Sequence, residues 1–209
     1  KIRSQLSRAL KTLSHGLLVA ALASLLGCGG GGPAIELPPD PKTASQATLE
    51  SLFSQITGQE ATAKPGSNRA AELAGQHKIV GGELAERAAA GVRTRVAAIP
   101  RVDGGFPLGP LQKEFEDAKA IARYDAAVHE SLVRELEPEL AATRNELAKR
   151  ERALAALGSD ALLDRLKLLS GLAELAGEGS PEQARYLSQR EELLGNVSIK
   201  LFETGSPDV

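Results

Sequence analysis

The chain has 209 residues, of which 42% are apolar, and this is enough for one folded domain with an attached tail. Aromatic residues make up only 3% and include no Trp, which disfavours carbohydrate or single-stranded nucleic-acid sites built on stacked rings. The formal net charge of −2 gives no attraction to DNA or to anionic lipid surfaces, so we expect no nucleic-acid partner.

The N-terminus combines a basic stretch with a short apolar run. Residues 1–15 contain four Lys or Arg and no acidic residue, and residues 16–27 form an uncharged run of twelve. A membrane-spanning helix needs about 20 apolar residues, so this run is too short to be a permanent span. We predict a cleavable signal peptide over residues 1–27. Because residue 1 is not Met, we expect translation to start slightly upstream.

The apolar run ends in Leu25-Leu26-Gly27-Cys28, which contains the only cysteine of the chain. These four residues resemble the lipobox of bacterial lipoproteins, with Leu25 and Gly27 as signal-recognition residues; Leu26 departs from the smaller residue that is usual there. The resemblance implies lipidation of Cys28, cleavage after Gly27 and often acylation of the new amine. Two or more acyl chains would attach the protein stably to a membrane. The alternative is a plain signal peptide or a short core helix with a chance cysteine.

Residues 28–44 are predicted to be a tether, because four consecutive glycines precede four closely spaced prolines. Gly29, with no Asp directly after the cysteine, resembles lipoproteins that enteric-type bacteria sort to the outer membrane. We therefore expect a protein of the cell envelope that is anchored to the outer membrane through Cys28 and faces the periplasm.

A mainly helical periplasmic domain is predicted over residues 45–209. Apolar residues at helical spacing indicate a helix from Ser45 to Gly58. Residues 59–76 are polar and rich in Ala, and they form either a loop or a short helix at 68–74. The composition of residues 83–90 favours a helix. Residues 92–99 alternate β-branched and polar side chains before a proline, so a strand is expected there.

From Leu111 one broad apolar stripe continues to Leu140 between charged residues, which predicts a long helix with a packing face. Leucines at seven-residue intervals beyond Leu140 suggest a coiled coil. Pro138 lies inside this stretch, and we expect a kink or a break there. We expect the stripe to be partly available for self-association or for a protein partner.

Residues 158–160 should end this helix and begin a leucine-rich helix over 162–175, with Ser159 or Asp160 as its cap. That helix should be buried on several sides and form a hairpin with the long helix. Ser180-Pro181 begins a last helix to about Leu194, and alternation predicts a closing strand at 197–203. The expected fold class is mainly α (α+β), a helical hairpin or small bundle with a minor two-stranded sheet.

The order of these elements resembles a family of uncharacterised bacterial lipoproteins with a helical hairpin between two strands. The likeness rests on this order, on Arg185-Tyr186-Leu187 and on the ending Val197-Ser-Ile-Lys-Leu-Phe-Glu203. The resemblance implies no activity.

No catalytic, cofactor or metal motif stands out in the sequence. His77 and His129, the histidines that follow the signal peptide, are not at metal-ligand spacing from another His or Cys. Two hypotheses stay open: a non-enzymatic structural or protein-interaction lipoprotein, and a small-ligand-binding or enzymatic domain whose pocket forms only on folding.

Overall fold

The computed structural model describes residues 32–204, and these residues form a mainly helical protein, as predicted. The chain divides into two units, one up to Leu84 and one from Ala85, and helix α3 contributes to both. In chain order the elements are η2 (Pro41–Thr43), α2 (Gln46–Glu60), α3 (Asn68–Ala98), α4 (Leu108–Lys119), η3 (Ala120–Arg123), α5 (Ala126–Ala156), α6 (Leu162–Ala176) and α7 (Pro181–Thr204).

The first unit pairs α2 with the beginning of α3. Ser45 caps α2, because its Oγ accepts a hydrogen bond of 3.1 Å from the amide of Thr48. Leu49 and Ile56 of α2 are fully buried, as are apolar residues of α3. The predicted helix from Ser45 is confirmed, although it continues beyond Gly58 to Glu60.

The extended segment before η2 contacts both helices of this unit. The carbonyl oxygen of Pro33 accepts hydrogen bonds from Gln59 and Arg69, at 3.0 and 2.9 Å. Ile35 is only 7% exposed, and its carbonyl accepts from Gln76 Nε2 at 3.0 Å. Part of the segment expected to be a tether therefore packs against α2 and α3.

The predicted strand at 92–99 is wrong, because residues 92–98 complete α3. Ala85, Ala89, Val92 and Val96 recur at helical spacing and pack together in one apolar cluster of the second unit. The β-branched residues of the alternating pattern thus continue a helical stripe that begins upstream of Gly91. This packing decides the conformation against the local preference.

The predicted long helix from Leu111 consists of two antiparallel helices. The chain turns at η3 and Asp125, where the Asp125 carboxylate accepts from the amides of Ala127 and Val128 and caps α5. No break occurs at Pro138, which lies inside α5. Proline has no amide N–H, so the carbonyl four residues before Pro138 lacks its helical hydrogen bond. Pro138 is exposed, and water can therefore reach this carbonyl.

Most of the apolar stripe of this region is buried, whereas Phe115 and Val128 are partly buried. Leu111 and Leu132 are 0% exposed and Leu140 is 4% exposed. Leu132 packs with α3, α4 and η3, whereas Leu140 packs with α4, α6 and α7. Because the chain turns at η3, the two halves of the stripe face each other, and binding of a partner through the long helix stays a prediction.

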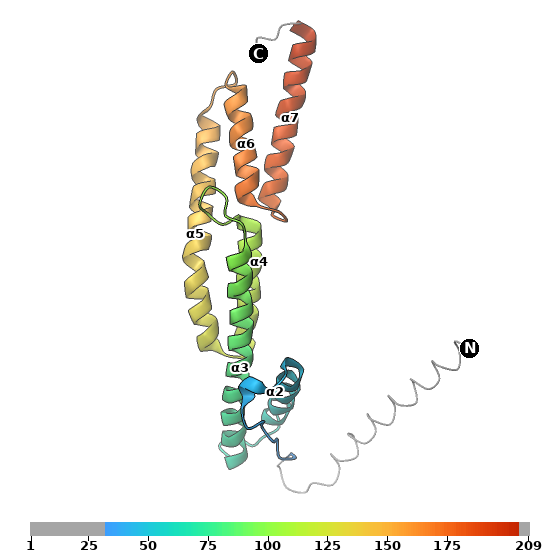
Figure 1. Cartoon of the computed structure of the whole chain (residues 1–209), viewed down its shortest axis with the longest axis vertical. Coiled ribbons are helices and arrows are strands. Elements are labelled where there is room, and N and C mark those ends of the chain that lie inside the picture. The colour runs from blue at the N-terminus through green and yellow to red at the C-terminus, as the bar shows by residue number, and fades with distance from the viewer. Residues whose placement is uncertain (1–31, 205–209) are drawn as a thin grey trace, which may run out of the picture. The chain divides into compact units, whose positions relative to one another are not determined.

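Helix α6 contacts both α5 and α7, and Figure 1 shows these three helices side by side. The predicted hairpin of the leucine-rich helix with α5 is therefore present. Leu169, Leu172 and Leu175 are buried, but Leu163 is 68% exposed. Near its start, α6 is therefore not buried on all sides. The cap residue is Ala161, without a side-chain hydrogen bond, and not the expected Ser159 or Asp160.

The turn from α6 to α7 packs tightly against the start of α4. Gly177 has a φ of +74°, and a Cβ at this position would lie 2.6 Å from Cβ of Pro107. Ser180 then caps α7, accepting from the amide of Gln183 at 3.1 Å. The predicted strand at 197–203 is wrong, because α7 runs to Thr204, and the part of the chain described contains no sheet.

Candidate functional site

The residues that the sequence singles out for lipidation and signal recognition, Cys28, Leu25 and Gly27, lie outside the described residues. Among the helices that are described, none combines the length and the apolarity needed to cross a membrane. The lipidation of Cys28 stays a prediction.

The two histidines considered as possible ligands take separate places. His77 Nδ1 lies 2.7 Å from a carboxylate oxygen of Glu60, and its ring meets the ring of Phe53 edge-on at 4.8 Å. His129 lies in the first turn of α5. Within residues 32–204, no group of three or more His, Cys, Asp or Glu is placed to hold a metal ion.

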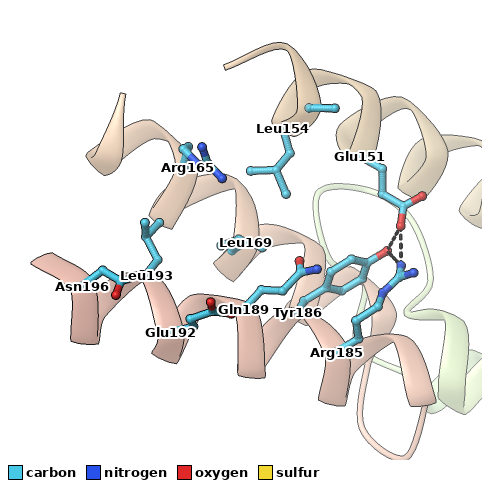
Figure 2. A pocket seen from close by; sticks show the side chains of 11 residues that line it. Glu151, Leu154, Arg165, Leu169, Arg185, Tyr186, Gln189, Glu192, Leu193 and Asn196 are labelled. Carbon is cyan, nitrogen blue, oxygen red and sulfur yellow. Dashed lines mark hydrogen bonds and ion pairs between the residues drawn. The ribbon is translucent and has the colours of Figure 1, made fainter. Parts of the chain in front are cut away.

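A pocket with a volume of about 490 Å³ lies between α5, α6 and α7 in the second unit. Figure 2 shows its polar and apolar walls. Most of its lining residues come from α7, and the rest come from the last turns of α5 and the first half of α6. They are Glu151, Leu154, Ala155, Arg165, Leu169, Arg185, Tyr186, Gln189, Glu192, Leu193 and Asn196.

One end of the pocket is formed by a hydrogen-bonded cluster of Glu151, Arg185 and Tyr186 (Figure 2). Tyr186 donates its hydroxyl proton to Glu151 Oε1 at 2.7 Å, and the same carboxylate oxygen forms an ion pair with Arg185. Arg185 Nη2 also donates to the Tyr186 hydroxyl at 2.8 Å, and its guanidinium lies 4.7 Å from the centre of the Tyr186 ring. The carboxylate of Glu151 is therefore compensated within the protein.

The electrostatics of this cluster favour the neutral phenol of Tyr186. Burial, together with the hydrogen bond that Tyr186 donates to Glu151, raises the pKa of Tyr186 to about 12. Tyr186 is 2% exposed and also belongs to the apolar core between α4, α5, α6 and α7. At neutral pH Tyr186 thus acts as a fixed hydrogen-bond donor and not as a base.

Arg165 lies at the other end of the pocket in the view of Figure 2. Its Nε is buried and has no hydrogen-bond partner among the described residues. None of the ion pairs within that part of the chain involves Arg165. Because this Nε is out of contact with solvent, only the terminal N–H groups of the Arg165 guanidinium, which lines the pocket, can donate to a bound acceptor.

A second hollow of about 360 Å³ lies on the α4 side of the same cluster. It shares Glu151, Arg185 and Tyr186 with the first pocket and adds residues of α4, among them Leu108 and Gln112. The cluster therefore forms a polar wall that separates two adjacent hollows.

The sequence did not identify the pocket, although two of its residues belong to Arg185-Tyr186-Leu187, on which the family resemblance partly rests. Glu151 looks like one of many charges on a solvated helix face, and Arg165 interrupts a leucine-rich helix without any motif around it. Glu151, Arg165 and the neighbouring Arg185 and Tyr186 line one pocket only because α6 packs against α5 and α7 packs against α6. Comparisons with protein-family models, with curated proteins and with solved structures found no match for this chain.

Proposed function

We propose that this protein is a membrane-anchored lipoprotein of the bacterial cell envelope, with a non-enzymatic structural or interaction role. One observation carries the proposal: the single cysteine of the chain stands where a lipobox requires it, in Leu25-Leu26-Gly27-Cys28. The short apolar run before it and the basic residues before that run have the composition of a signal peptide. Cys28 holds the lipid, and the helical units are carried on the side to which the signal exports them.

A protein partner, in this proposal, contacts the polar surfaces of the helices. The leucines of the stripe on α4 and α5 pack inside the protein, since Leu111, Leu132 and Leu140 are buried. The exposed face of α5 carries charges of both signs, including Glu130 and Arg134, which lie 3.8 Å apart. Contacts made by such a face are polar, exchange readily with water and weaken with salt.

The decisive experiment is metabolic labelling of the chain, preceded by an initiator Met, with an alkyne fatty acid in a bacterial host. We expect wild type to incorporate the probe, to lose residues 1–27 and to fractionate with membranes. Cys28→Ala should abolish the label and the cleavage together, because lipidation precedes cleavage in lipoproteins. Leu26→Ala, which restores the smaller residue usual at that position, is the matched control and should retain both.

The alternative interpretations give different results in the same gel. A plain signal peptide predicts cleavage without label in wild type, and equal cleavage in Cys28→Ala. An uncleaved core helix predicts neither label nor cleavage in any variant. Either result would refute the lipoprotein proposal.

A further inference from the structure

We infer that the pocket between α5, α6 and α7 binds an amphipathic monocarboxylate, with Arg165 holding the carboxylate and the leucines of the pocket covering the apolar body. The inference concerns the second unit alone and does not depend on lipidation of Cys28. The residues that carry it are Arg165 on one side, the Glu151, Arg185 and Tyr186 cluster on the other, and three leucines.

Arg165 supplies the recognition of charge. Its guanidinium forms no ion pair among residues 32–204, whereas Arg185, the other arginine of the pocket wall, pairs with Glu151. A guanidinium presents its N–H groups as a planar fork that matches the two oxygens of a carboxylate. A ligand carboxylate at this position would gain a charge-assisted hydrogen bond from the terminal N–H groups of Arg165.

The apolar part of the pocket suits a short hydrocarbon body. Leu154 of α5, Leu169 of α6 and Leu193 of α7 contribute one leucine from each helix to the lining. The volume of about 490 Å³ lies within the range of small-molecule pockets, about 300–1,000 Å³. Burying the methylene groups of a ligand against such side chains removes apolar surface from water and so favours binding.

The remaining charges favour a single negative charge on the ligand. Glu151 already accepts from Tyr186 and pairs with Arg185, so Arg185 is not free to bind a second anionic group. Glu192 also lines the pocket, and its carboxylate repels further negative charge. A monocarboxylate therefore fits better than a phosphate dianion.

The test is calorimetric titration of the full chain with octanoate, which stays monomeric at useful concentrations, and with 1-octanol as the uncharged analogue. We expect wild type to bind octanoate more tightly than 1-octanol. Arg165→Gln should weaken octanoate binding by about tenfold or more, the effect of one charge-assisted hydrogen bond, and change 1-octanol binding by less than about twofold.

Three variants make the outcome specific. Arg152→Gln, on an exposed arginine of α5 outside the pocket, should bind octanoate like wild type. Leu193→Gln should weaken both ligands, because it removes apolar wall. If Arg165→Gln changes the helical circular dichroism, Arg165→Lys replaces it and should still lose octanoate affinity, because a lysine lacks the planar fork.

Two results would overturn the inference. One is equal octanoate affinity in the Arg165 variants and in Arg152→Gln, which would mean that the carboxylate does not contact Arg165. The other is octanoate binding in wild type that is absent or no tighter than that of 1-octanol, which would mean that the pocket does not recognise the charge.

Discussion

At the scale of single residues, one buried side chain ties the loop before α4 to the middle of α5. Thr143 is 3% exposed, and its hydroxyl donates a hydrogen bond of 2.9 Å to the carbonyl oxygen of Phe106. Thr143→Val keeps the shape but leaves this carbonyl without its donor, so we expect a loss of about 1–3 kcal/mol in the free energy of unfolding. Urea denaturation measures it.

The matched control is Thr94→Val on α3, where the exposed hydroxyl donates to the carbonyl of Ala90 in its own helix. Its loss should change the free energy of unfolding by less than about 0.5 kcal/mol. Equal effects of the two substitutions would contradict a structural role for the bond between Thr143 and Phe106.

Tyr186 should make the stability of the second unit fall at high pH. Burial raises its pKa to about 12, whereas the pKa of a tyrosine in an unfolded chain is about 10. The stabilisation is fully present below the unfolded pKa and is lost as the pH rises from about 10 to about 12, because only the unfolded state releases the proton there. Phenolate absorbance in a Tyr124→Phe background should therefore show a midpoint near the higher value while the helical signal persists.

Glu151→Gln tests how much the hydrogen bond to Glu151 adds to the effect of burial on the pKa of Tyr186. It removes the carboxylate that accepts the hydroxyl proton of Tyr186 at 2.7 Å, so the midpoint should move toward lower pH. Ionisation of Tyr186 near pH 10 in the folded wild-type protein would show that the phenol is not buried as described.

At the scale of the helices, burial of individual leucines decides which faces hold the fold together. Leu132 of α5 and Leu169 of α6 are 0% and 3% exposed and belong to different apolar clusters. Replacing either by Ala should cost about 2–5 kcal/mol, because each substitution leaves a cavity in a packed core. Leu163→Ala, at a position 68% exposed, should cost less than about 1 kcal/mol. Thermal and urea denaturation of the three variants measure these costs, and a mild effect at Leu132 would mean that the stripe is accessible.

At the scale of the whole molecule, the beginning of the folded region can be located by truncation. The segment before Ser45 buries Ile35 and accepts hydrogen bonds from Gln59, Arg69 and Gln76. A fragment that begins at residue 33 should therefore be more stable than one that begins at residue 45, by about 1–3 kcal/mol, while both remain mainly helical. Circular dichroism melts of the two fragments provide the comparison, and identical melts would mean that residues 33–44 act only as a tether.

The sequence by itself determined the helical class and several helix ends, because the signals for these are local. Ser45 and Ser180-Pro181 start helices through caps whose chemistry needs only the next three residues. The leucine-rich pattern of α6 likewise depends only on the spacing within one helix. The composition of residues 1–28 predicts an export signal and a lipid site for the same reason.

Only the tertiary structure decided where the chain turns and which apolar residues are buried in the core. Residues 92–98 show a period of two, yet they are helical because Val92 and Val96 complete a face with Ala85 and Ala89 against α4 and α5. The apolar stripe continues without interruption across η3, so the sequence pattern does not show that the chain reverses there. The pocket is also tertiary in origin, since Glu151, Arg165 and Tyr186 come from three helices and share no sequence motif. The free energy of packing between distant segments exceeds the small conformational preferences of single residues, on which sequence patterns depend. The helix at 92–98, the reversal at η3 and the pocket therefore become apparent only in the folded structure.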